Sequence, residues 1–290
     1  MTDKIPLANP NAHVFVPDGI SEATALGRIT HLGIGAHPDD LEFMAFHGII
    51  QCFASQEKWF GGVTCSNGSG SARAGVYAAC TDEQLVKVRL AEQNKAAVVG
   101  EYGIMLQLGY GSKEVKTPAD RSLEDDLFAI LEASTPEVIY THNLADKHET
   151  HIGVVIATLR ALRRLPKDKR PKQVIGCEVW RDLDWLDDSA KIFMDITGHD
   201  HTAGALNGIF DSQIAGGKRY DISTPGRRAA NATYFNSHTT DAATQAIIGM
   251  DLTPLIVDDS LDICKYALAF VQQLHNDIET KLNAQLSYPR

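Results

Sequence analysis

The sequence lacks the marks of membrane and nucleic-acid-binding proteins. No stretch of the 290 residues approaches the roughly 18 apolar residues that a membrane-spanning helix needs, and the first residues hold no signal-peptide run. We therefore expect a cytoplasmic protein without a transmembrane segment. Basic residues are outnumbered, with 27 Lys and Arg against 37 Asp and Glu, which gives a formal net charge of −10. Nucleic-acid binding needs clustered cations, so no nucleic-acid partner is expected.

Cysteine and nucleotide-binding motifs are also scarce. The five cysteines are scattered and form no CxxC pair, which argues against a thiolate zinc site and against a disulfide framework. The glycine- and serine-rich segment 66–75 has neither the GxGxxG fingerprint nor the GK[ST] of a phosphate-binding loop. Nucleotide binding is therefore not expected.

Strand-like and helix-like segments alternate through the first two thirds of the chain. Short apolar strands are expected at 31–36, 62–65, 104–108, 138–141 and 174–179, with helices at 41–56, 81–99, 123–133 and 152–165. This order predicts an α/β fold, a Rossmann-like, mostly parallel sheet with helices on both faces. We divide the chain into an N-terminal arm (1–28), a catalytic core (29–185) and a mainly helical C-terminal extension packed on the same domain (186–290).

Metal-ligand side chains are concentrated directly after two of these strands. The first segment, 36–40, reads AHPDD, and the second, 141–151, reads THNLADKHETH. In open α/β sheets ligands bind beyond the carboxyl ends of the strands, so the two segments are expected to face each other. Imidazole nitrogen and carboxylate oxygen suit zinc, and three protein ligands with an open position describe a catalytic zinc site.

A hydrolase of this kind also needs a base and a group that stabilises an oxyanion. Asp39 and Asp40 are neighbours, so one can bind metal while the other faces water. His148 and His151 fall on one face if a helix begins near them, so one can bind metal while the other points at substrate. Two histidines and one carboxylate also describe a non-haem iron enzyme, and a non-catalytic binding protein on the same fold is a third possibility.

The two segments together resemble the PIG-L/LmbE family of zinc-dependent N-deacetylases. Its pattern is a strand ending in [AT]-H-P-D-D followed later by H-x-x-H, here His148 to His151, and the resemblance covers roughly 29–215. It implies a Rossmann-like fold and one Zn²⁺ per chain, held by His37, Asp40 and His151. It also implies Asp39 as the general base, His148 as the group that stabilises the oxyanion, and an N-acetylated amino sugar or sugar conjugate as substrate.

The sequence departs from the family pattern at three places. Leu41 follows the Asp pair where many relatives have Glu, and Glu42 comes next. Relatives often have HPDH in the second motif, whereas here the intervening residues leave Asp146 and Glu149 as competing partners behind the metal ligands. Phe210 replaces the His of a later H-x-S-Q motif, which affects the expected substrate contacts more than the metal ligands.

Further side chains are candidates for contact with a small N-acylated sugar. Backbone and side chains of the 66–75 segment can approach a sugar, and the basic stretch from residue 218 can select an anionic group. A homo-oligomer is possible. The candidate substrate-binding residues are Asn67, Arg73, His142, Asp146, Gln213, Lys218 and Arg219.

Overall fold

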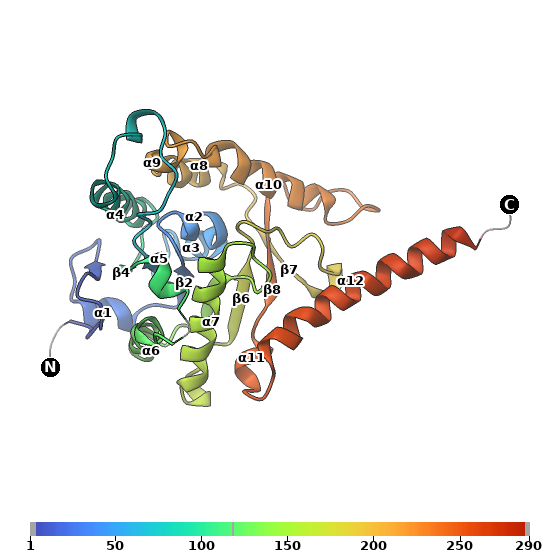
Figure 1. Cartoon of the computed structure of the whole chain (residues 1–290), viewed down its shortest axis with the longest axis horizontal. Helices are drawn as coiled ribbons and strands as arrows, with labels where there is room; N and C mark the ends of the chain where they lie inside the picture. The colour runs from blue at the N-terminus through green and yellow to red at the C-terminus, as the bar shows by residue number, and fades with distance from the viewer. Residues whose placement is uncertain (1–3, 118, 288–290) are drawn as a thin grey trace.

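The computed structural model describes residues 4–117 and 119–287, and an eight-stranded sheet runs through its centre (Figure 1). The strand order is β1-β4-β3-β2-β5-β6-β8-β7. The five strands from β4 to β6 in this order pair in parallel, and the strands at both edges are antiparallel. The strands are β1 (His13–Phe15), β2 (His31–Gly35), β3 (Phe60–Ser66), β4 (Ile104–Tyr110), β5 (Val138–His142), β6 (Gln173–Cys177), β7 (Lys191–Asp195) and β8 (Ala246–Asp251).

Helices cover both faces of the sheet, as the alternation of elements predicts (Figure 1). One apolar core lies between the sheet and α1, α6, α7 and α11, and the other lies between the sheet and α2, α3, α4 and α8. The predicted α/β fold class is therefore confirmed. The helices are α1 (Glu22–Gly27), α2 (Asp40–Met44), α3 (Phe46–Cys52), α4 (Asp82–Val99), α5 (Ser112–Val115), α6 (Ser122–Ser134), α7 (Glu149–Arg164), α8 (Asp200–Gly208), α9 (Asp211–Ile214), α10 (Tyr220–Tyr234), α11 (Pro254–Val257) and α12 (Ile263–Leu286), with the 3-10 turns η1 (Gly75–Tyr77), η2 (Lys167–Lys169) and η3 (Asp188–Ala190).

Three segments differ from the sequence-based expectation. The helix expected over 41–56 is broken at Ala45 into α2 and α3. The N-terminal arm contributes β1 and α1, and the C-terminal extension, although mainly helical, adds β7 and β8 to the sheet. A three-residue strand is too short to show alternation, and the apolar run of β8 is buried at five of its six positions, so periodicity cannot separate it from a buried helix.

The centre of the sheet places the two motif segments side by side. Strands β2 and β5 are hydrogen-bonded neighbours and run in parallel, so the segments that follow them leave from the same edge. Gly33 allows close packing at this point, because a Cβ there would lie 2.8 Å from the Phe60 ring and 2.9 Å from Leu41. The convergence of the two segments, which the predicted metal site requires, follows from this pairing.

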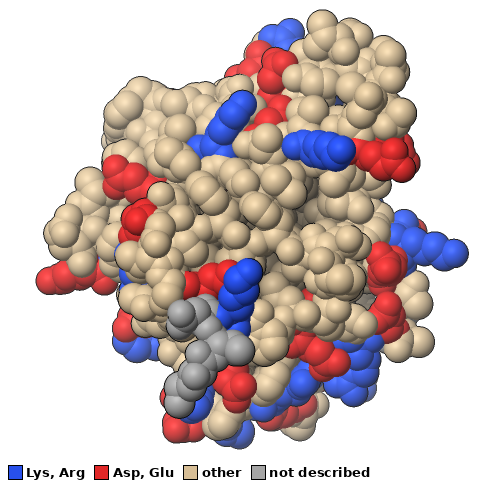
Figure 2. Space-filling view, turned by 90° about the vertical axis from the view of Figure 1, so that its left-hand side faces the viewer, with Lys and Arg blue, Asp and Glu red and all other residues tan. Residues whose placement is uncertain are grey.

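Among the helices of 4–117 and 119–287, none combines the length and apolarity that crossing a bilayer would take. On the face shown in Figure 2, basic and acidic side chains are interspersed over the part that the structure describes. Helix α12 extends away from the body of the molecule toward the C-terminus (Figure 1).

Candidate metal centre and its cavity

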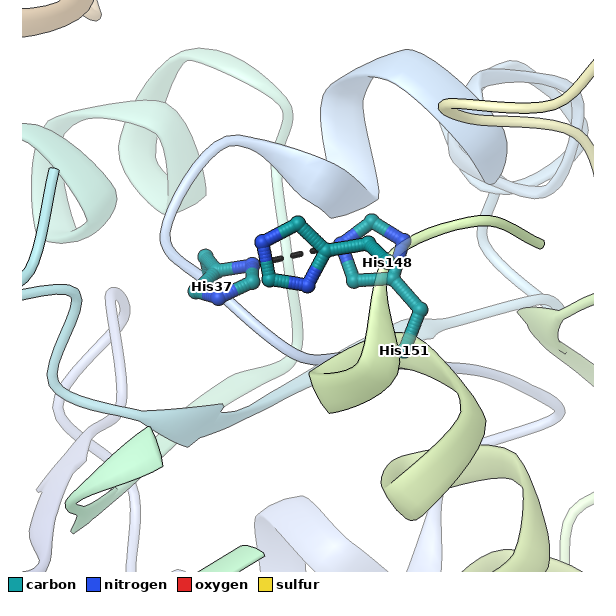
Figure 3. A group of neighbouring side chains, drawn as sticks. All are labelled: His37, His148 and His151. Carbon is teal, nitrogen blue, oxygen red and sulfur yellow. Dashed lines mark hydrogen bonds between the residues drawn. The ribbon is translucent and has the colours of Figure 1, made fainter. Parts of the chain in front are cut away.

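Three side chains from the two motif segments point their donor atoms at one another. His37 Nδ1 lies 3.3 Å from Asp40 Oδ2 and 3.3 Å from His151 Nε2, and His151 Nε2 lies 3.5 Å from Asp40 Oδ2. His37 comes from the loop after β2, whereas His151 sits in the first turn of α7, and the dashed line in Figure 3 joins their ring nitrogens. His148, the N-cap of α7, stacks beside them with its ring centroid 4.7 Å from that of His151.

The donor set fits a tetrahedral zinc ion. Bonds of 2.0–2.1 Å at tetrahedral angles place neighbouring ligand atoms about 3.3 Å apart, close to the separations among these three atoms. Asp40 Oδ2 also accepts the backbone N–H groups of Ala36 at 3.0 Å and of His37 at 2.7 Å, which fixes its orientation. Behind His151, Asp146 Oδ2 lies 3.3 Å from Nδ1, so the ring is oriented with Nε2 toward the cluster.

His142 lies beneath the cluster rather than in the cavity. Its ring is fully buried and stacks on His151 with a centroid distance of 3.8 Å. Its Nε2 accepts the Ala36 N–H at 2.9 Å and lies 3.4 Å from Asp40 Oδ2, which gives a second cluster of possible ligands, Asp40, His142 and His151. Because its ring is fully buried and does not line the cavity, His142 is not positioned to contact substrate.

The pKa values of the adjacent carboxyl groups of Asp39 and Asp40 are shifted in opposite directions. Burial alone would raise the pKa of Asp40, but the imidazoles of His151 and His142 outweigh it and hold the pKa well below its usual range. Burial raises the pKa of Asp39 well above its usual range, and Arg89 opposes this only in part. Asp40 therefore remains an anion, as a metal ligand must, while Asp39 is the carboxyl that readily accepts a proton.

Asp39 is held in place by helix α4. Its carboxylate Oδ2 lies 3.1 Å from Arg89 Nη2, and its backbone N–H donates to Gln93 Oε1 at 3.1 Å. Asp39 also has a φ of 103°, a conformation that non-glycine residues rarely adopt and that clusters at functional sites. Sequence reasoning missed Arg89 and Gln93. The available signal was their position on the buried face of α4 with Leu85 and Ala96, where apolar residues are expected.

A cavity of about 820 Å³ opens over this cluster, a volume typical of small-molecule sites. The residues that bound it come from the segments after β2, β3, β4, β5 and β6 and from α2, α4, α9 and α10. They include His37, Asp39, Asp40, Phe43, Arg89, Lys116, Lys147, His148, Glu178, Trp180, Gln213, Lys218, Tyr220, Arg227 and Arg228.

The structure brings only some of the predicted substrate contacts to this cavity. Gln213 and Lys218 line it, whereas His142 and Asp146 lie behind the cluster. The other three do not line it and are engaged with other groups. Asn67 accepts the Ser69 N–H, Arg73 donates to Ser69 and Cys80 carbonyls and pairs with Asp82, and exposed Arg219 pairs with Asp221.

Of the two candidate partners behind the metal ligands, Asp146 contacts His151, whereas the side chain of Glu149 is open to solvent. Asp146 is buried against His151, and it also accepts the backbone N–H of His148 at 2.9 Å and that of Trp180 at 3.1 Å. Glu149 is exposed and lies 3.5 Å from Lys116 Nζ. Phe210, in place of a family His, is fully buried in the apolar core and does not line the cavity.

The fold and the cluster define the class, a doubly wound α/β protein with a candidate metal centre at the carboxyl ends of its parallel strands. Residues 32–162 match the model of the PIG-L family, described as GlcNAc-PI de-N-acetylase. This match confirms the resemblance to the PIG-L/LmbE family that the two motifs carry. No curated protein matches the sequence at a significant level.

Several solved structures share the fold at low sequence identity. GalB, the 4-carboxy-2-hydroxymuconate hydratase from Pseudomonas putida KT2440, is 17% identical with a TM-score of 0.61, covering 77% of this chain and 96% of its own. The conserved protein TT1542 from Thermus thermophilus is 15% identical (TM-score 0.60, 81% and 99%). The N,N'-diacetylchitobiose deacetylase from Pyrococcus horikoshii is 14% identical (TM-score 0.59, 83% and 90%).

Proposed function

We propose that this chain is a zinc-dependent hydrolase that removes the acetyl group from an N-acetylated amino sugar or sugar conjugate. The observation that carries the proposal is the meeting of His37, Asp40 and His151 within 3.5 Å, with a second carboxylate, Asp39, left over beside them. The PIG-L match and the deacetylase among the structural neighbours support a hydrolytic deacetylase.

The roles of the residues follow from their donors and their charge. When bound, one zinc ion on His37, Asp40 and His151 supplies a Lewis acid that makes water more acidic and an amide carbonyl more electrophilic. Asp39 takes the proton from the attacking water as general base, because its carboxylate faces the cavity with a raised pKa. The same carboxyl then delivers that proton to the departing amine nitrogen.

His148 is placed to stabilise the oxyanion. Burial and the neighbouring His151 and His37 lower its pKa to about 4, so the ring is neutral near pH 7. Its Nδ1 accepts the Thr150 N–H at 3.3 Å, so the proton of the neutral ring is on Nε2. His148 therefore offers a hydrogen-bond donor on the cavity side, where negative charge develops on the carbonyl oxygen.

The fold alone does not decide the reaction, because GalB, a hydratase, shares it. The experiment is therefore a panel of N-acetylated sugars, including N-acetylglucosamine and N,N'-diacetylchitobiose, assayed for released acetate with zinc measured by elemental analysis. We expect Asp39→Asn to retain zinc and lose hydrolysis by a factor of about 10²–10⁴. We expect His151→Ala to lose zinc.

Three outcomes would contradict the proposal in different ways. A zinc-free Asp39→Asn protein would contradict the division of roles between the two carboxylates. Iron in protein purified without chelator would favour the non-haem iron alternative. Bound zinc with no acetate released from any sugar of the panel would contradict the proposed reaction.

A further inference from the structure

The cavity has a charge opposite to that of the chain as a whole. Although the chain carries a formal net charge of −10, the cavity is lined by six basic side chains and by three carboxylates, Asp39, Asp40 and Glu178. Two of these carboxylates belong to the reaction centre, where Asp39 pairs with Arg89 and Asp40 is surrounded by imidazoles. The remaining basic side chains are Lys116, Lys147, Lys218, Arg227 and Arg228.

Three of these basic side chains, Lys218, Arg227 and Arg228, belong to α10 or the residues just before it, and they mark the α10 end of the cavity. Lys116 has Glu149 as a partner at 3.5 Å. Within 4–117 and 119–287, the other four have no carboxylate oxygen within the 4.0 Å of an ion pair. Glu178, in the loop after β6, is the carboxylate that interacts with Arg227 and Arg228, so it offsets only one of the three positive charges of Lys218, Arg227 and Arg228.

Glu178 is itself held by other groups. It accepts hydrogen bonds from the Asn231 side chain and from the backbone N–H groups of Leu183 at 3.3 Å and Ile248 at 3.4 Å. Arg228 is 2% exposed, and its Nε and Nη1 have no hydrogen-bond partner among the described residues. Its Nη2 donates to the Glu42 and Phe43 carbonyl oxygens at 2.8 and 3.1 Å. Since a buried charge without an ion-pair partner among the described residues is costly, the guanidinium favours a bound anion at this end of the cavity.

An aromatic side chain connects this end to the reaction centre. The Trp180 ring centroid lies 6.3 Å from that of His148, and Lys218 Nζ lies 4.9 Å from the Trp180 ring. A sugar whose acyl group sits at His148 can therefore reach Trp180 with its ring and Lys218 with a charged substituent. The volume of about 820 Å³ leaves room for more than an acetamido group.

We propose that Lys218 and Arg227, backed by Arg228 and Lys147, form a subsite for a phosphate or carboxylate group on the substrate. This proposal rests on the proposed function, and it narrows the substrate class to anionic N-acyl amino sugars. Guanidinium and ammonium groups bind either anion through charge-assisted hydrogen bonds, so the two chemistries must be separated by experiment.

The test measures binding, so that it does not depend on turnover. Isothermal titration calorimetry measures the affinities of N-acetylglucosamine, N-acetylglucosamine 6-phosphate and N-acetylmuramic acid. Each sugar is titrated into three zinc-loaded proteins: the unmodified chain, the double variant Lys218→Gln/Arg227→Gln and the single variant Arg219→Gln. Arg219 is the matched control, since it lies next to Lys218 but pairs with Asp221 outside the cavity. We expect one charged sugar to bind at least about tenfold tighter than the neutral one, and the double variant to remove that preference.

The outcomes separate this proposal from the proposed function. Tighter binding of the phosphate or of the carboxylate sugar identifies the anion. Equal affinity for charged and neutral sugars would overturn the subsite, as would a preference that survives in Lys218→Gln/Arg227→Gln, since the anion would then be bound elsewhere, for example by zinc. A charged sugar that binds through Lys218 and Arg227 without releasing acetate would instead count against the proposed function alone.

Discussion

Arg89 Nη2 and Asp39 Oδ2 lie 3.1 Å apart, with both side chains buried. The same guanidinium donates to the carbonyl oxygens of Pro38 and Gly68, so it links α4 to the loops that follow β2 and β3. Asp39 has no other cationic partner within ion-pair distance among the described residues. Arg89 is thus the group that opposes the rise in the Asp39 pKa caused by burial and that fixes the orientation of this carboxylate.

We expect Arg89→Gln to lower kcat for acetate release by about tenfold to 100-fold while zinc content stays unchanged. Removing the cation leaves Asp39 buried without a partner, which favours its protonated form. The exposed Lys87 on the same helix supplies the control, and Lys87→Gln should leave kcat unchanged. In the double variant with Asp39→Asn, the loss should not exceed that of Asp39→Asn alone. Additive losses would show that Arg89 acts independently of Asp39.

The metal-ligand residues of the candidate site could be predicted because they belong to two short sequence motifs. The AHPDD segment and the H-x-x-H pair each follow a short apolar strand, and parallel pairing of β2 and β5 brings them together. The expected helix over 81–99 likewise begins with a capping box that is local in sequence, in which Thr81 and Gln84 exchange hydrogen bonds. These features depend on neighbours within a few residues or on a general rule of sheet topology.

The walls of the cavity could not be predicted in the same way. Arg89, Trp180 and Arg228 reach it from three elements that are distant in the sequence, and nothing in their local sequence shows which way each side chain points. Arg73 is a candidate substrate contact from its place in the glycine- and serine-rich segment 66–75. In the structure, however, Asp82 and two carbonyl oxygens hold its guanidinium. Tertiary partners, which a single sequence does not display, decide such assignments.

Asp146 should control the affinity for zinc. Its carboxylate orients His151 from behind at 3.3 Å, and it also fixes the backbone at His148 and Trp180. We expect Asp146→Asn to weaken zinc binding by about tenfold to 100-fold, as measured by competition with a chelator of known affinity. The exposed Glu149 three residues later is the control, and Glu149→Gln should bind zinc as the unmodified chain does. Equal affinity in both variants would rule out this role for Asp146.

Gly48 makes close packing of α3 on the sheet possible. A Cβ at this position would overlap the ring of Tyr140, whose hydroxyl is tied to His47 Nδ1 at 3.0 Å. We expect Gly48→Ala to lower the free energy of unfolding by about 1–3 kcal/mol in a urea titration. At Gly204 in α8 a Cβ would have no neighbour within 4 Å, so Gly204→Ala should be neutral or stabilising by up to about 1 kcal/mol. Similar behaviour of the two variants would contradict this account.

His31 should make the fold less stable in mild acid. Burial lowers its pKa from 6.5 to about 4, so between these values the unfolded chain binds a proton that the folded chain does not. The free energy of unfolding therefore falls as pH drops from about 6.5 toward 4, by at most about 1.4 kcal/mol for each pH unit, and His31 has no such effect above this window. His31→Gln should flatten the dependence between pH 6.5 and 4. Urea titrations of both proteins in excess chelator, which removes the contribution of metal loss, would show parallel curves if His31 were not the group responsible.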